Sequence, residues 1–182
     1  MLNSVLKFWF EEIDPKLHFS PSPAFDAEIR ARFEMMANKA AAKLLNHEHP
    51  AENTPTGSLA LIILLDQFPR NMYRGTKAAF AWDPLALGLA KRAVKKGHDL
   101  RTTIERRSFY YMPFMHSENL EDQNSCVKLV DQRLEDDNTL FHAKAHRKLI
   151  KQFGRFPHRN DVLGRESETD ELTYLKDGGY TP

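Results

Sequence analysis

Apolar residues recur every three or four positions along most of this 182-residue chain, and no segment alternates between apolar and polar residues. The first spacing places side chains on one face of an α-helix, whereas alternation would indicate a half-buried strand. The run Leu59–Leu65 is apolar at every position. It indicates a helix buried on all sides, because the chain offers no alternating segment that could pair with a strand. We therefore predict an all-α fold.

Capping residues, prolines and glycines divide this pattern into seven or eight helices. The first is a short buried helix over 2–10, the last a short helix over 169–175, and loops are expected over 14–23 and 47–55. The predicted N-terminal caps are Ser22, Thr56, Thr102 in a box with Glu105, Ser117 and Asn138. The predicted helix ends are Pro69, Gly97, Pro113 and Gly154.

Short connections between consecutive helices favour roughly antiparallel pairs, which helical repeat stacks and irregular bundles share. The chain shows no fixed-period repeat and no linker that would divide it. We therefore expect a single domain over residues 1–182, which can bury roughly 70% of its unfolded surface.

The charges of the chain nearly cancel, with 26 Lys and Arg residues against 25 Asp and Glu residues. A global field that would collect nucleic acid or an anionic membrane is therefore not expected. The longest apolar run, Leu59–Leu65, is far shorter than the roughly 20 residues of a membrane-spanning helix. Cys126 is the single cysteine, and residues 1–14 lack the pattern of a signal peptide. We therefore expect a cytoplasmic protein.

Two segments echo each other: Phe68-Pro69-Arg70-Asn71 and Phe156-Pro157-His158-Arg159-Asn160. In each, an aromatic residue and a proline follow the expected end of a helix, and an arginine and an asparagine come next. A guanidinium at a rigid turn suits bidentate recognition of a carboxylate or phosphate. The same side chains could instead bond the exposed carbonyls at the helix end, and Asp66 could be the internal partner of Arg70.

The helix expected before Gly154 carries His142 and His146 on one stripe with apolar residues. Neutral core histidines and a histidine-lined ligand pocket are both open interpretations. The pair has the spacing of a metal chelate, which His116 and Glu118 could complete. However, a zinc site needs at least a third protein ligand, and no His-Glu-x-x-His pattern is present. We predict no metal ligand and no cofactor.

Residues 141–165 form the densest group of titratable side chains, with seven Lys and Arg residues and one acid. Lys144, Lys148 and Lys151 should lie on a solvated helix face, and the acidic segment 166–171 could fold back on the block. A nucleic-acid partner is therefore disfavoured.

Acid–base chemistry has one further candidate region. Tyr111, His116 and Glu118 lie close together in sequence, and Arg107 precedes Tyr111 on the helix expected to end at Pro113. A tyrosine, a histidine and a carboxylate can transfer protons. An aromatic-rich junction between two helices would have the same composition, so both interpretations stay open.

Three longer motifs carry a family resemblance: LALIILLDQFPRN from Leu59, YMPFMHSE from Tyr111 and FGRFPHRNDVLGR from Phe153. Over nearly the whole chain they resemble the bacterial domain-of-unknown-function family 924. The resemblance implies an all-helical fold grouped with the tetratricopeptide-repeat-like (TPR-like) proteins. It implies no established activity and no cofactor.

The motifs hold more polar and ionisable side chains than helix capping requires, so the first hypothesis is a pocket for a small anionic ligand. Enzymatic activity is left open. Proton transfer would fall to His116, Glu118, His146 and His158. Ligand binding would fall to Asp66, Arg70, Asn71, Arg107, Tyr111, Arg155, Arg159, Asn160 and Arg165. The alternatives are a TPR-like module for a protein partner, and an internal ion network that only fixes helix packing.

Overall fold

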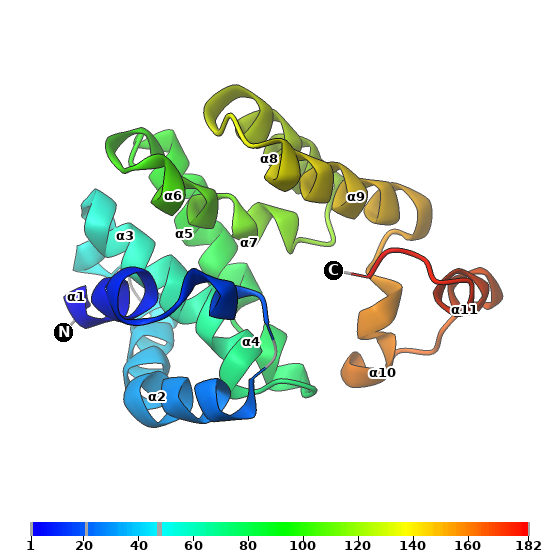
Figure 1. Ribbon diagram of the computed structural model, residues 1–182, viewed down its shortest axis with the longest axis horizontal. Helices are drawn as coiled ribbons and strands as arrows, with labels where there is room; N and C mark the ends of the chain where they lie inside the picture. Colours follow the sequence, from blue (N-terminus) through cyan, green and yellow to red (C-terminus); the bar gives the residue numbers. More distant parts are fainter. Residues whose placement is uncertain (1, 21, 47–48, 182) are drawn as a thin grey trace. The chain divides into compact units, whose positions relative to one another are not determined.

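The computed structural model describes residues 2–20, 22–46 and 49–181 (Figure 1). Within these ranges the chain forms α-helices, short 3₁₀ turns and two π-helical turns, and no strand. The all-α prediction is therefore confirmed. The chain divides into two compact units, Met1–Pro113 and Phe114–Pro182, which are described one at a time. The single domain and its TPR-like arrangement stay predictions.

The first unit is built from six α-helices and the turns that join them. The helices are α1 (Asn3–Lys7), α2 (Pro23–Asn46), α3 (Pro55–Ile62), α4 (Phe68–Met72), α5 (Asp83–Lys95) and α6 (Ile104–Arg107). Two π-helical turns, Phe8–Glu12 and Ile63–Gln67, follow α1 and α3. The 3₁₀ turns are Pro15–His18, Pro50–Asn53, Lys77–Phe80, Asp99–Arg101 and Ser108–Tyr110. The first two lie in the predicted loops, of which residues 21, 47 and 48 fall outside the described ranges.

The second unit contains one long helical pair and a C-terminal segment. Its helices are α8 (Leu120–Arg133), α9 (Asp137–Phe153), α10 (Asn160–Leu163) and α11 (Thr169–Lys176), with a 3₁₀ turn at Pro157–Arg159. The short α7 (Met112–Met115) contains the boundary between the units. Helices α8 and α9 pack side by side (Figure 1). Because only residues 134–136 join them, they run antiparallel, as predicted for consecutive helices.

The predicted central helix is confirmed. Every residue of Leu59–Leu65 is at most 2% exposed, and α3 packs against both α1 and α5. An aromatic cluster lies beside it, in which the ring of Phe68 is 5.5 Å from Trp9 and 4.8 Å from Phe33. Each fully buried side chain of this kind contributes about 1.5–3 kcal/mol to folding.

The predicted helix end at Pro69 is wrong, because the helix continues through a π turn to Met72. The backbone N–H of Phe68 bonds the carbonyl of Ile63, five residues back. Because the π turn is wider than an α-helical turn, the missing N–H of Pro69 does not end the helix. The Asp66 carbonyl accepts a hydrogen bond from the Arg70 side chain at 2.7 Å.

Several predicted caps are shifted by one or two residues. Ser22 is confirmed, since its Oγ accepts from the N–H of Phe25. Three helices are capped by a side-chain oxygen of another residue than predicted: Thr54 instead of Thr56, Asn119 instead of Ser117, and Asp136 instead of Asn138. A fourth begins after Thr103 instead of the Thr102–Glu105 box, and Thr103 makes no side-chain cap bond. Each stretch contains more than one residue able to cap, and packing decides among them.

Glycine ends two helices as predicted, and proline does not end a third. Gly97 and Gly154 have φ of +67° and +69°, which a residue with a Cβ rarely adopts. Pro113 lies inside α7, because the preceding helix has already ended at Arg107. Splits of this kind raise the number of α-helical segments in the described ranges to eleven. None of the helices described combines the length and apolar character needed to cross a membrane.

Replacing Thr54 by alanine should lower the free energy of unfolding by about 1 kcal/mol, because its Oγ1 accepts the N–H of Gly57 at 3.1 Å. Thr56→Ala is the matched control, since the exposed Thr56 follows the cap in the first turn. It should change the stability by less than about 0.5 kcal/mol. Urea unfolding followed by circular dichroism measures both values. Equal losses would contradict the assignment of Thr54 as the cap.

Candidate functional site

The predicted site residues fall into two sets. The first unit contains Asp66, Arg70, Asn71, Arg107 and Tyr111. The second unit contains His116, Glu118, His146, Arg155, His158, Arg159, Asn160 and Arg165. Each set is considered within its own unit.

Arg70 is bound inside the first unit. Its two terminal nitrogens donate to the two carboxylate oxygens of Asp83, both at 2.9 Å. Nη1 also bonds the Asp66 carbonyl and lies 3.4 Å from the Asp66 carboxylate. The predicted internal partner is therefore present, and most of the hydrogen-bonding capacity of Arg70 is used by the protein itself.

The remaining residues of the first set also make contacts within the unit. Asn71 donates to Asp26 at 2.8 Å, and the Tyr111 hydroxyl donates to Asp99 at 2.7 Å. Arg107 donates to the Asp99 carbonyl at 3.0 Å. These are the contacts of an internal network that holds helix ends together. A ligand-binding role for the first set stays a prediction.

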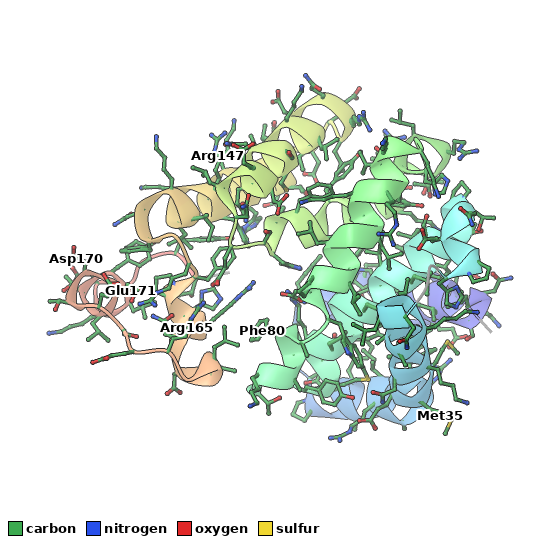
Figure 2. All side chains as sticks on the ribbon, turned by 180° about the vertical axis from the view of Figure 1, so that it is seen from behind. Met35, Phe80, Arg147, Arg165, Asp170 and Glu171 are labelled. Atoms are coloured by element: carbon green, nitrogen blue, oxygen red, sulfur yellow. The ribbon has the colours of Figure 1, made fainter. Side chains whose placement is uncertain are left out.

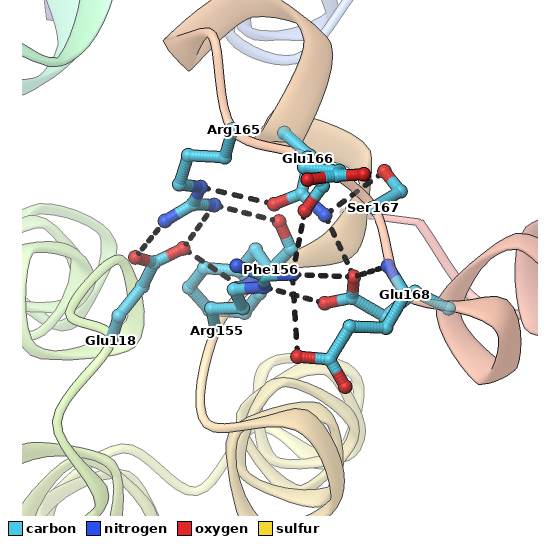
Figure 3. Close-up of polar contacts among 9 residues, drawn as sticks. Glu118, Arg155, Phe156, Arg165, Glu166, Ser167 and Glu168 are labelled. Atoms are coloured by element: carbon cyan, nitrogen blue, oxygen red, sulfur yellow. Dashed lines mark hydrogen bonds and ion pairs between the residues drawn. The ribbon is translucent and has the colours of Figure 1, made fainter.

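In the second unit, Glu118 and Arg165 form a two-bond ion pair (Figure 3). The distances are 2.6 and 3.0 Å, and Glu118 also accepts the backbone N–H of Phe156 at 2.8 Å. Burial alone would raise the pKa of Glu118, but the bonds from Arg165 and Phe156 lower it below its ordinary value. Arg165 donates further to the side chain of Asn160 at 3.0 Å. Glu118 is therefore an ionised anchor at neutral pH.

A second ion pair joins Arg155 to Glu171, a residue that the sequence analysis did not select. Arg155 bonds both carboxylate oxygens, at 2.6 and 2.7 Å. Glu171 also accepts from Asn160 at 3.0 Å and from the backbone N–H of Glu168 at 2.8 Å. Glu171 is 2% exposed, and the bond from Arg155 is the main cause that lowers its pKa to about 2. The predicted fold-back of the acidic segment is confirmed, and the capping-box spacing of Glu168 and Glu171 was the available signal.

The other candidates of the second unit surround the buried ring of Phe156. We call His116, His146, His158, Arg159 and Phe156 the Phe156 cluster. The Arg159 guanidinium lies 4.4 Å from the ring centroid of Phe156 and donates to the His116 carbonyl at 3.1 Å. The imidazoles of His146 and His158 lie 5.6 and 5.7 Å from the same ring. The side chains of two of the four predicted proton-transfer residues, His146 and His158, therefore lie against this ring, and His116 contributes its backbone carbonyl.

The side chains of His146 and His158 in this cluster are uncharged at neutral pH. Burial, together with the nearby Arg159 charge, lowers the pKa of His146 to about 3 and that of His158 to about 4. His146 Nδ1 lies 2.8 Å from the His142 carbonyl oxygen, so Nδ1 carries the proton and Nε2 keeps its lone pair. His158 Nδ1 is buried and has no hydrogen-bond partner in the part of the chain that is described. Neutral imidazoles can bind a ligand but cannot act as cationic acids.

A polar hollow of about 590 Å³ lies in the same unit. It is lined by Arg155 and by residues 166–170. Because Glu171 already binds Arg155 and acidic side chains surround the hollow, it does not suit an anion. No group of three or more His, Cys, Asp or Glu residues among those described is placed to hold a metal ion.

The family model described as bacterial protein of unknown function (DUF924) matches residues 5–179. The chain belongs to this family. The structure of the protein of unknown function ATU0120 from Agrobacterium tumefaciens is similar to that of this DUF924 protein, with a TM-score of 0.89 and 38% identity over 97% of each chain. No functionally curated protein matched. The family resemblance read from the motifs is confirmed, and these descriptions assign no ligand or reaction.

Replacing Glu171 by glutamine should lower the free energy of unfolding of this DUF924 protein by about 2–4 kcal/mol, because it leaves a partly buried guanidinium without its counter-charge. Glu168→Gln is the matched control, since Glu168 lies 3.8 Å from the same arginine but its side chain is 81% exposed. It should cost less than about 1 kcal/mol. Because the pKa of Glu171 is lowered, its contribution should disappear as the pH falls from 4.5 towards 2. A control as damaging as Glu171→Gln would contradict this ranking.

The stability of the protein should also fall between pH 7 and pH 5. The unfolded chain binds a proton at each histidine near pH 6.5, whereas His146 binds one only near pH 3. Each pH unit below 6.5 therefore removes about 1.4 kcal/mol through His146. In urea unfolding, the free energy of unfolding of His146→Gln should fall less steeply with decreasing pH than that of the wild type, by about 1.4 kcal/mol per pH unit. A difference between the two proteins that stays constant from pH 7 to pH 5 would exclude a depressed pKa at His146.

Proposed function

We propose that this DUF924 protein binds a small anionic molecule, with a carboxylate or phosphate group, at the Phe156 cluster of its second unit. The other predicted arginines of the unit, Arg155 and Arg165, are held by Glu171 and Glu118. The proposal therefore narrows the predicted pocket to Arg159 with His116, His146 and His158.

The observation that carries the proposal is the buried Nδ1 atom of His158, which has no hydrogen-bond partner within the described ranges. A buried polar atom left in this way costs about 1–3 kcal/mol, and folded proteins keep few of them. Its neighbour Arg159 is 6% exposed, so a positive charge is also held away from water. An anionic oxygen bound here would accept from the His158 ring and be attracted by the guanidinium.

The low pKa values of His146 and His158 define how a ligand would act. A negative charge beside the imidazoles would favour their protonated forms and raise both pKa values. Binding would therefore be accompanied by proton uptake and would tighten as the pH falls from 7.5 to 5.5. Any enzymatic step would begin from this proton uptake, because the free site has neutral histidines.

The arrangement of the helices and the cellular location are also part of this proposal. A TPR-like arrangement of the helices is supported by their antiparallel packing in α8 and α9. A cytoplasmic location is supported by the single cysteine, Cys126, which is buried and whose pKa is raised to about 12 by burial. The structural alternative applies most directly to Arg70, Arg107, Arg155 and Arg165, while Arg159 also donates to a backbone carbonyl.

The test replaces His158 by phenylalanine, which keeps a ring against Phe156 and removes the unpartnered nitrogen. A panel of inorganic phosphate, sulfate, acetate and succinate is titrated at pH 5.5 and 7.5, with histidine ring NMR signals and thermal midpoints as readouts. At least one anion should shift the His158 and His146 signals of the wild type and raise its midpoint by several degrees near saturation. The His158→Phe protein should bind at least tenfold more weakly, yet be as stable as the wild type or more so.

Arg147→Gln is the matched control, because Arg147 is a partly exposed cation on α9 that is not part of the cluster. It should leave anion binding within twofold. The proposal fails if no anion moves the histidine signals, or if His158→Phe binds as tightly as the wild type. A large loss of stability in His158→Phe without any anion binding would favour the structural alternative.

A further inference from the structure

The outer face of α9 carries four cations that the rest of the described chain does not neutralise. Lys144, Arg147, Lys148 and Lys151 are spaced i, i+3, i+4 and i+7, so they form one stripe on the helix. The three lysines are exposed and Arg147, which is labelled in Figure 2, is partly exposed. Within the described ranges none of the four has an ion pair, whereas Arg155, just beyond α9, is bound by Glu171. We call these four residues the α9 stripe.

The α9 stripe is more than an ordinary solvated helix face. Solvated helices usually place acids three or four residues from their cations, but here those neighbours are other cations. The like charges repel one another and weaken the isolated helix. The helix dipole favours only Lys151, which lies in the last turn. Phe141, which is 62% exposed, lies three residues before Lys144 and adds an apolar contact at the end of the same face.

Acidic residues bound the α9 stripe on both sides. Glu135, Asp136 and Asp137 are exposed at the start of α9. Beyond its end, Arg155 brings the acidic segment close, since it bonds the Glu166 carbonyl at 2.9 Å and lies 3.8 Å from Glu168. The positive surface is therefore short, about 10 Å along the helix axis. A long polyanion such as nucleic acid, or a flat anionic membrane, would extend beyond the stripe and be repelled by these flanking carboxylates.

We infer that the α9 stripe is a docking surface for a short acidic helix of a protein partner. Two turns of helix with Glu or Asp at i, i+3, i+4 and i+7 have the same length and spacing as the stripe. An apolar residue at one end of that helix would cover Phe141. Charge complementarity would set the encounter rate and make the complex sensitive to salt. This inference does not depend on the anion site proposed for the Phe156 cluster.

The experiment uses the full chain and a fluorescein-labelled helical peptide of fourteen residues with glutamates at i, i+3, i+4 and i+7 and one terminal leucine. Fluorescence anisotropy should give a dissociation constant that rises at least fivefold between 50 and 300 mM salt. A peptide of the same composition with shuffled glutamates should bind at least fivefold more weakly. The double variant Arg147→Glu/Lys148→Glu should bind at least twentyfold more weakly.

Lys39→Glu/Lys43→Glu is the matched control, because it makes the same charge change at two exposed i, i+4 positions of α2. It should bind the peptide within twofold of the wild type. Thermal midpoints show that each variant is folded. The inference is overturned if both double variants lose binding equally, if the shuffled peptide binds as well, or if no binding is seen at millimolar concentration. Tighter binding to a twenty-nucleotide single strand or to anionic vesicles, or self-association lost in Arg147→Glu/Lys148→Glu, would also overturn it.

Discussion

A carboxylate that leaves water must be given a positive charge or hydrogen-bond donors inside the protein, and the C-terminal part of this chain depends on that requirement at Glu171. Four donor atoms surround this carboxylate: two from Arg155, one from Asn160 and the backbone N–H of Glu168. The apolar core nearby is small, consisting of Leu149, Ile150 and Phe156 with three partly buried aromatic residues. Burial of apolar surface alone therefore does little to define the path of this segment. The ion pair fixes where residues 155–171 run after α9, and with it the position of Arg159 and His158 beside Phe156.

The first unit follows the same rule with a larger apolar core. Glu52 is 3% exposed and is bound by two nitrogens of Arg92 at 2.9 Å, although it lies in a turn that the sequence indicated only as a polar loop. Arg70 joins Asp83 to the π turn that contains Asp66. Arginines in motifs are thus used largely as internal counter-charges. A motif rich in arginine is weak grounds for a ligand site until each guanidinium has been checked for an internal partner. Arg159 itself packs on an aromatic face and donates to a backbone carbonyl.

The sequence determined helix positions wherever one local signal dominated. Leu59–Leu65 indicated a buried helix because no alternating segment was present to pair with a strand, and Gly154 was correctly predicted to end a helix, where its φ is +69°. Pro69 misled the prediction because a π turn, which has no simple sequence signature, absorbs the missing N–H. For the candidate site, the spacing of His146 indicated an inward side chain correctly. The capping-box spacing of Glu168 and Glu171 indicated a helix start but not the pairing of Glu171 with Arg155, because Arg155 lies sixteen residues away and long-range charge pairs leave no periodic pattern.

The second unit presents positive charge in two environments, and the difference between them determines what each can recognise. Arg159 is held away from water beside neutral imidazoles, where a charge interacts strongly and a ligand must fit the donors in order to replace lost hydration. The cations of α9 stay hydrated, so each contributes little alone and only a matched spacing of several acids gains from them. Recognition at Phe156 should therefore depend on the shape and protonation of a small ligand and change little with salt. Recognition at the α9 stripe should instead depend on salt and on charge spacing, because its cations stay hydrated.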